Sequence, residues 1–284
     1  MAEPSVVSQT VMPLDPAATS ARRPLDQIAD GEPIISFRGV HKSFGDHHIL
    51  RGIDLDFERG RTTVVIGPSG TGKSVTMKLI VGLLRPEEGD VWFAGTNVPD
   101  APERELMGVR RRIGMMFQDG ALFDSMTVGD NIAFPLQRHT KLGAGEIDDR
   151  VERSLLQVGL PGIQDQMPSS LSGGMRKRVS LARAIIHEPE IVMFDEPNSG
   201  LDPLTSDEID NLICRMKEEL GITFVVISHD IVGTFAVADR IAMLYNGQLI
   251  ANGTPEEILH SSEPVLRSFL ARNMELPQLR DTRP

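Results

Sequence analysis

The sequence has 284 residues, of which 40% are apolar, enough to form the core of one large domain or of a domain with a small subdomain. Its formal net charge of -11 argues against a nucleic-acid-binding protein, because such proteins bind mainly through Lys and Arg side chains that neutralise phosphates. The single cysteine, Cys214, excludes an internal disulfide, and no apolar run reaches the roughly 20 residues that a transmembrane helix needs.

Residues 1–32 are rich in Pro, Ala and Ser and include acids such as Glu3 and Asp15. They lack a continuous apolar segment followed by a small-residue cleavage site, so the pattern does not indicate a signal peptide. We expect a disordered leader over 1–32.

Ordered structure is expected to begin with 33–37, which alternates as a strand, and 48–53 gives a second strand pattern. Three later runs, 62–66, 191–194 and 222–227, are apolar and lack polar alternation, which is how strands buried on both faces read. Helical patterns separate these runs. The sequence therefore predicts an α/β protein with a mostly parallel central sheet covered by helices.

The first buried run leads through a glycine-rich loop into a helix expected over about 73–84. Between 121 and 172 the strand patterns stop, and helical stretches are joined by Gly and Pro. We interpret about 121–175 as a helical subdomain inserted into the α/β core. The end of the chain, 261–284, is expected to form a short helix around 264–271 and then a polar tail.

The loop after the first buried strand fits the phosphate-binding pattern GxxxxGK[ST] at every fixed position. Its residues are Gly67, Pro68, Ser69, Gly70, Thr71, Gly72, Lys73 and Ser74. The glycines allow backbone N–H groups to turn around phosphates, and the following helix adds its positive end. Lys73 should reach the β- and γ-phosphates, and the Ser74 hydroxyl should bind Mg²⁺. Alone, this loop indicates only a nucleoside triphosphatase.

A second acidic site follows the buried run 191–194, which ends in Asp195 and Glu196. At the carboxyl end of a buried strand, Asp195 can hold the Mg²⁺ coordination shell, directly or through water. Glu196 points elsewhere and can polarise the attacking water. Two adjacent acids near phosphates would be costly unless the metal and Lys73 offset their charge.

A second anion site is indicated at Ser172, Gly173 and Gly174, where Ser172 occupies the N-cap position of a helix. A chain that already has one phosphate loop has no evident use for another within its own site. A trans arrangement resolves this, with Ser172 of one copy covering the γ-phosphate held by another copy.

Taken together, these motifs resemble the ATP-binding subunit of ABC transporters, over about residues 34 to 270. The ordered set also includes Phe117-Gln118, Ser199-Gly200-Leu201-Asp202 and His229. The resemblance implies a P-loop NTPase core with a mostly parallel sheet, an N-terminal antiparallel β subdomain and an inserted α-helical subdomain, within an ATPase domain over 33–260. It also implies ATP hydrolysis, ATP and Mg²⁺ as ligands, and a homodimer.

By position, the resemblance implies further roles. Phe44 matches the aromatic on which adenine stacks, with a core aromatic as the alternative. Gln118 matches the glutamine that touches Mg²⁺ and the water and links the site to the membrane partner. Asp202 matches the loop that crosses to the other copy. His229 matches the histidine that contacts the γ-phosphate in catalysis. Met175 departs from the family pattern, which has Gln there, and this puts one ribose contact in doubt.

Three short segments resemble the Mla/Mce/Mkl branch of the family: 117–128, the signature variant 173–178 and the ending 262–270. That branch powers movement of phospholipids or related hydrophobic molecules between bacterial membranes. It works with a multi-spanning permease and an MCE-domain lipid-binding protein. The resemblance implies a peripheral subunit on the cytoplasmic face of the inner membrane that contacts the membrane only through partners.

Two other functions share part of this pattern. The ATPase of an importer for small polar solutes such as amino acids shares every motif except these three segments. A soluble ABC ATPase of DNA repair or translation would carry a long coiled coil or a second fused ATPase domain, and the sequence shows neither.

The segment 119–126 follows Gln118 and is a candidate contact for the permease, since Leu122, Phe123 and Met126 are apolar among small and polar neighbours. The alternative is that these side chains pack inside the helical subdomain, which is the favoured reading for Leu122.

Overall fold

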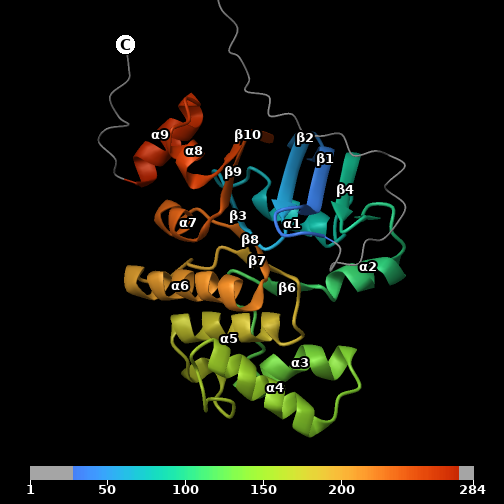
Figure 1. The fold of residues 1–284 in the computed structure, drawn as a ribbon, viewed down its shortest axis with the longest axis vertical. Helices are drawn as coiled ribbons and strands as arrows, with labels where there is room; N and C mark the ends of the chain where they lie inside the picture. Colours follow the sequence, from blue (N-terminus) through green and yellow to red (C-terminus); the bar gives the residue numbers. More distant parts are fainter. Residues whose placement is uncertain (1–27, 275–284) are drawn as a thin grey trace, which may run out of the picture.

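The computed structural model describes residues 28–274, so most of the expected leader and the last part of the expected tail lie outside the described residues. Figure 1 shows the arrangement of its elements. In chain order these are β1 (Pro33–Phe44), β2 (His47–Glu58), β3 (Thr62–Ile66), α1 (Lys73–Ile80), β4 (Glu88–Phe93), β5 (Thr96–Asn97), α2 (Glu103–Arg110), β6 (Ile113–Met116), α3 (Val128–His139), α4 (Ala144–Gln157), η3 (Pro168–Ser170), α5 (Gly173–Ile185), β7 (Ile191–Asp195), α6 (Pro203–Leu220), β8 (Thr223–Ile227), α7 (Ile231–Val237), β9 (Arg240–Tyr245), β10 (Gln248–Gly253), α8 (Pro255–Leu259) and α9 (Pro264–Asn273).

The central sheet has six strands in the order β10-β9-β3-β8-β7-β6, and all neighbours pair in parallel except β10 with β9. Every residue of β3 and β8 is buried. Successive side chains of β3 enter two different cores: Val64 and Ile66 join the cluster on one face, and Val65 joins the cluster on the other. This alternation is why the strand is apolar throughout.

A second, four-stranded antiparallel sheet has the order β2-β1-β4-β5. Its inward side chains, among them Phe37, Phe57 and Phe93, share one core with α1 and with one face of the central sheet. Figure 1 places this sheet beside α1, at the blue and teal end of the molecule. The expected fold class is confirmed: a mostly parallel core, an N-terminal antiparallel sheet and an inserted helical part.

The other face of the central sheet is covered by helices whose apolar residues form the second core, among them Ile132, Leu155, Leu181 and Ile213. Helices α3, α4 and α5 pack against one another, and α5 also contacts β6 and α6. Figure 1 shows α3 and α4 at the end of the molecule opposite the antiparallel sheet. No helix within residues 28–274 is long and apolar enough to span a membrane.

Several elements differ from the expected ranges. The first two strands are longer than 33–37 and 48–53, because their pairing continues through bulges to the hairpin turn at 44–47. Helix α1 ends at Ile80, four residues before the expected end. The described segment 28–32 is packed: Ile28 is 3% exposed and the backbone of Glu32 pairs with that of Arg59.

Strands β4, β5, β6, β9 and β10 had no separate sequence prediction. Strand β6 is four residues long and includes Gly114, so its composition gives a weak strand signal. It forms because it pairs along β7, with Gly114 opposite Val192, which no local pattern reveals. At Gly114 an added Cβ would lie 2.3 Å from the Ala184 carbonyl oxygen, so α5 approaches the strand closely only because this residue has no side chain.

Gly114→Ala should therefore lower the free energy of unfolding by about 1–3 kcal/mol, since the new methyl group forces α5 away from β6. Gly108→Ala is the matched control, because Gly108 lies in the exposed interior of α2 with open space around its Cα. That change should stabilise by up to about 1 kcal/mol through helix propensity. Urea unfolding of both variants measures the difference. Equal stability of the two would show that the close approach is absent in solution.

Candidate functional site

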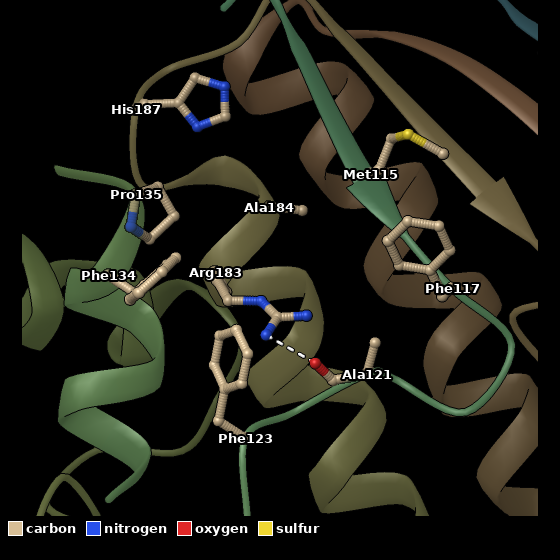
Figure 2. A pocket seen from close by; sticks show the side chains of 9 residues that line it. All are labelled: Met115, Phe117, Ala121, Phe123, Phe134, Pro135, Arg183, Ala184 and His187. Carbon is tan, nitrogen blue, oxygen red and sulfur yellow. Dashed lines mark hydrogen bonds between the residues drawn. The ribbon is translucent and has the colours of Figure 1, made fainter. Parts of the chain in front are cut away.

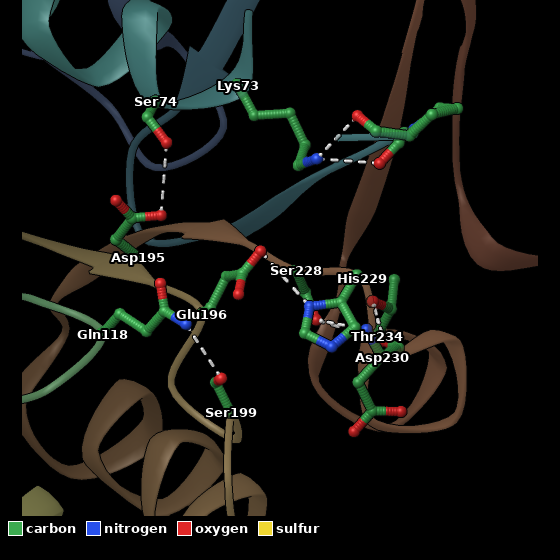
Figure 3. Close-up of polar contacts among 12 residues, drawn as sticks. Lys73, Ser74, Gln118, Asp195, Glu196, Ser199, Ser228, His229, Asp230 and Thr234 are labelled. Carbon is green, nitrogen blue, oxygen red and sulfur yellow. Dashed lines mark hydrogen bonds and ion pairs between the residues drawn. The ribbon is translucent and has the colours of Figure 1, made fainter. Parts of the chain in front are cut away.

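The candidate residues meet at the carboxyl edge of the central sheet. Lys73 and Ser74 begin α1 after β3, Asp195 is the last residue of β7 with Glu196 directly after it, and His229 follows β8. Because β8 lies between β3 and β7, the three loops are neighbours. Figure 3 shows their side chains facing one another, with Gln118 beside them. This edge is where ligands bind in open α/β sheets.

Two glycines shape the loop before α1. Gly67 has φ +146, and a Cβ there would lie 2.2 Å from the Leu244 carbonyl oxygen. Gly72 has φ +99, and a Cβ there would lie 2.6 Å from the Leu50 side chain. Both positions combine a left-handed backbone with a close neighbour, so a side chain is excluded at each. Ser69, Gly70 and the Ser74 end of the loop are exposed.

Lys73 is enclosed by the loop it follows. Its Nζ donates hydrogen bonds to the carbonyl oxygens of Gly67 at 2.8 Å and Pro68 at 3.0 Å. Burial lowers the pKa of Lys73, while the carboxylates of Glu196 and Asp195 oppose that shift. The ammonium group therefore sits in a site that favours an added anion.

The two acids carry a matching electrostatic cost. Burial and the neighbouring Glu196 raise the pKa of Asp195, and a hydrogen bond from Ser74 partly offsets this. Ser74 Oγ donates to Asp195 Oδ1 at 3.5 Å. A divalent cation between these oxygens would favour the ionised carboxylate, and hydroxyl and carboxylate oxygens suit Mg²⁺. The residues present therefore fit a metal–phosphate ligand.

Glu196 faces His229 across the gap between β7 and β8. Glu196 Oε1 and His229 Nδ1 are 3.2 Å apart, and the histidine side chain is 60% exposed against 22% for the glutamate. The backbone of Glu196 is in the left-handed region, with φ +53, and its N–H donates to the Ile227 carbonyl at 2.9 Å. A non-glycine residue keeps this conformation only where its surroundings fix it.

Gln118 lies just after β6 and is exposed. Its Nε2 donates to Ser199 Oγ at 3.0 Å, which ties it to the loop after β7. Lys177, on α5, donates from Nζ to the carbonyl oxygen of Gln118 and, at 3.4 Å, to that of Glu196. We did not identify Lys177 from the sequence, because a lysine in a helical pattern usually faces solvent.

Phe44 ends β1 at the hairpin turn, and its side chain is 48% exposed. The core-aromatic alternative is therefore wrong. Lys42 Nζ lies 5.3 Å from the ring centroid, and the same ammonium is held by Glu87 and by the Arg85 carbonyl. The ring is oriented by this contact and offers an exposed surface for stacking.

Ser172 and Asp202 are the N-caps of two adjacent helices. Ser172 Oγ accepts from the backbone N–H of Met175 at 3.2 Å, and Asp202 accepts from Thr205. A Cβ on Gly174 would lie 2.5 Å from the Thr205 side chain, so the two helix starts are in close contact. Gly173 also begins α5.

These helix starts belong to a different part of the fold from the phosphate loop. Helix α5 packs against α3, α4, α6 and β6, whereas α1 packs against β4. Met175 is half-buried and packs against the larger apolar core, so its side chain is used within the chain.

A groove lies beside the segment after Gln118, with a volume of about 400 Å³ and an apolar lining (Figure 2). Its residues are Met115, Phe117, Ala121, Phe123, Phe134, Pro135, Arg183, Ala184 and His187. Phe123 is half-exposed, and the centroid of its ring lies 5.0 Å from that of Phe134. Leu122 instead packs against the core, which confirms the core-packing alternative for that residue. Met126 is not among the residues that line the groove.

A buried carboxyl group lies next to the Glu196 loop. Asp210, on α6, is 6% exposed and accepts a hydrogen bond from Asn198 Nδ2 at 2.9 Å. Burial raises the pKa of Asp210 to about 6, and the carboxylates of Asp230 and Asp207 add to the shift, while the Asn198 amide opposes it. No sequence pattern pointed to Asp210, since an acid in a helical pattern is usually solvated.

The ABC transporter family model matches residues 50–199. The chain is 43% identical over 236 residues to the "Probable ribonucleotide transport ATP-binding protein mkl" of Mycobacterium leprae, covering 83% of this chain and 68% of that protein. It is 40% identical over 237 residues to the "Intermembrane phospholipid transport system ATP-binding protein MlaF" of Escherichia coli K12, covering 84% and 88%.

Solved structures give the same picture. The chain superposes on cbiO1 from Clostridium perfringens, described as part of the ABC transporter complex cbiONQ, with a TM-score of 0.77, 31% identity and coverage of 89% of this chain and 100% of that one. It also matches the dimeric ATP-binding cassette MJ0796 in a post-hydrolysis state bound to ADP and Pi, with a TM-score of 0.70, 30% identity and coverage of 78% and 98%.

The raised pKa of Asp210 predicts a specific pH dependence of stability. Because the folded state holds this proton more tightly than the unfolded state, the group's contribution to stability falls as pH rises from about 4 through about 6. Asp210→Asn removes this loss and should raise the free energy of unfolding by up to about 3 kcal/mol at pH 8, with a smaller gain at pH 5.

Chemical denaturation at both pH values measures this difference, and Asp148→Asn, an exposed acid on α4, is the control. A gain for Asp210→Asn that is equal at pH 5 and pH 8 would contradict the assignment.

Proposed function

Because the chain belongs to the ABC transporter family of ATP-binding subunits, we propose that its ATP hydrolysis powers the movement of phospholipid or another hydrophobic molecule through a separate permease. Hydrolysis of ATP coupled to transport is the activity of this family. The observation that carries the proposal is the convergence of the phosphate loop, Asp195, Glu196 and His229 at one edge of the sheet. The proposed ATPase domain is 33–260, with its helical subdomain at about 121–175.

The nucleotide is held by its two ends. Adenine stacks on the exposed ring of Phe44. The backbone N–H groups of the loop 67–74 surround the phosphates at the start of α1, and Lys73 exchanges its carbonyl partners for phosphate oxygens.

The metal shell is assigned to Ser74, Asp195 and Gln118. Mg²⁺ bound there supplies charge neutralisation on the β- and γ-phosphates. Ser74 and Asp195 already face each other at hydrogen-bond range, and Gln118 approaches from β6.

Hydrolysis is assigned to Glu196 as general base. Its carboxylate takes a proton from water while the water oxygen attacks the γ-phosphorus, and the bond to the β–γ bridging oxygen breaks to leave ADP. His229 lies 3.2 Å from Glu196 and is exposed on its other side, so it can contact both the base and the γ-phosphate. Gln118 positions the water.

The complete site requires a homodimer. Ser172, Gly173 and Gly174 start a helix that packs away from the chain's own phosphate loop, so we assign them to the γ-phosphate of the partner copy, with Asp202 crossing beside them. The MJ0796 structures are described as dimeric, which supports this arrangement.

Glu196→Gln should preserve ATP binding while turnover falls by roughly 10² or more, because the water loses its base. The variant should accumulate as an ATP-bound dimer on size-exclusion chromatography. Adding Ser172→Arg to Glu196→Gln should abolish that dimer, since the arginine blocks the trans contact. Near wild-type turnover of Glu196→Gln would refute the base, and a dimer that survives Ser172→Arg would refute the trans site.

The permease is assigned to the apolar groove. Its lining includes Phe117 and Ala121, on either side of Gln118, so a helix bound there contacts a segment tied to the nucleotide site. Arg183 forms part of the groove wall and holds the backbone carbonyls of Gly120 and Ala121 at 2.8 Å. The resemblance to the Mla/Mce/Mkl branch adds two further parts to the proposal. The complex includes an MCE-domain protein, and this subunit lies on the cytoplasmic face of the inner membrane.

The cargo has a second candidate. The Mycobacterium leprae relative is named for ribonucleotide transport, which is a polar solute, and it is as similar to this chain as the MlaF proteins are. The segments 117–128, 173–178 and 262–270, which resemble the Mla/Mce/Mkl branch, support a lipid cargo. Stimulation of the reconstituted complex by phospholipid or by ribonucleotide decides between the two cargoes.

Phe123→Ala should leave the ATPase activity of the isolated subunit within about twofold of wild type, because the ring lies outside the nucleotide site. The same change should weaken assembly with the permease and abolish lipid stimulation in proteoliposomes. Leu156→Ala is the control, as an exposed apolar residue of α4 outside the groove. Unchanged assembly and stimulation by Phe123→Ala would remove the groove from the coupling path.

A further inference from the structure

One side-chain amide joins three elements behind the catalytic edge. Asn198 Nδ2 donates to Asp210 Oδ1 at 2.9 Å and to Asp230 Oδ2 at 3.3 Å. Asn198 belongs to the loop after β7, Asp210 to α6 and Asp230 to the start of α7. The amide thus lies between two carboxylates that come from different parts of the chain.

The two ends of this connection sit next to the proposed catalytic pair. Asn198 is two residues after Glu196, whose left-handed backbone must be fixed by its surroundings. Asp230 follows His229 directly (Figure 3). Asp230 is itself held firmly: its Oδ1 accepts from Gly233 N at 3.1 Å and its carbonyl accepts from Thr234 Oγ1 at 2.6 Å.

The cluster is closed to ligands. A Cβ on Gly233 would lie 2.6 Å from Asp210 Oδ2, 2.7 Å from Asp230 Oδ2 and 3.0 Å from Asn198 Nδ2. The backbone of α7 therefore fills the space between the three side chains, and neither a metal ion nor a substrate fits there.

The Asn198 amide is held by the two carboxylates that accept from its Nδ2, while its Oδ1, which is buried, accepts no hydrogen bond from the residues that the structure describes. Leaving such an oxygen unpaired has a cost. That cost is offset because both N–H groups face carboxylates, where hydrogen bonds are strengthened by charge.

We propose that Asn198 is a positioning residue, which locks the Glu196 loop to the His229 loop through Asp230 and Asp210. The inference rests on the proposed roles of Glu196 and His229. The neutral amide is essential to it: without this donor the Glu196 loop loses its hydrogen bonds to both carboxylates, and Asp210 and Asp230 repel each other, which pushes α6 away from the start of α7.

Asn198→Ala should lower kcat by about 10- to 100-fold while KM for ATP changes less than about twofold, because a small misplacement of the base affects turnover more than binding. Asn198→Asp places a third carboxylate in the cluster and should be at least as impaired. Asn211→Ala, an exposed asparagine on α6, is the control and should keep wild-type kcat.

The decisive variant exchanges the amide and a carboxylate. In Asn198→Asp with Asp210→Asn, the new amide at 210 can bridge the carboxylates at 198 and 230, so kcat should return to within about threefold of wild type. Rescue by exchange is expected only if the position of the amide within the cluster, and not residue 198 alone, controls the loops.

Thermal melting establishes that each variant is folded, and if Asn198→Ala is not, the comparison of Asn198→Asp with the exchanged pair carries the test. Wild-type kcat in folded Asn198→Ala, or equal kcat in Asn198→Asp and the exchanged pair, overturns the proposal. Glu196→Gln measured alongside separates the two hypotheses: its inactivity upholds the base when the Asn198 proposal fails, and near wild-type activity refutes the proposed role of Glu196 itself.

Discussion

The site depends on one constraint: five parallel strands are buried on both faces, so their polar ends can leave the core only at the edge. At that edge Lys73, Asp195 and Glu196 lie close together, and burial leaves Lys73 and Asp195 poorly solvated. Burial shifts the pKa of Lys73 down and that of Asp195 up, each toward its neutral form. A ligand that carries both negative phosphates and a cation relieves both shifts at once.

Much of this arrangement could be predicted from the sequence because its signals are local. The phosphate loop has fixed spacing, and the run 191–194 ends directly in two acids. Their apolar strands predicted a parallel sheet, and parallel strands bring their carboxyl ends to one edge. Phe44 could be assigned only through the resemblance to the family, by its match to the aromatic on which adenine stacks, and the structure leaves its ring exposed.

The rest depends on contacts between distant residues, which local patterns do not encode. Lys177 reads as a surface lysine, yet it is buried because it reaches the carbonyls of Gln118 and Glu196. Asp210 likewise has the pattern of a solvated helix residue, yet it is buried and accepts a hydrogen bond from Asn198. Strand β6 is weak by composition and forms by pairing with β7, and its Gly114 lets α5 pack closely against it. In each case the decisive partner is far away in the sequence.

The close approach of Gly174 to Thr205 has a consequence for how one subunit senses another. With 2.5 Å between the Thr205 methyl group and the place of a Cβ on Gly174, the starts of α5 and α6 cannot slide past each other. Ser172 and Asp202, the N-caps of these two helices, are therefore held at a fixed spacing by direct packing. In the proposed dimer, the partner's nucleotide would therefore contact two helix starts whose spacing is set within this chain.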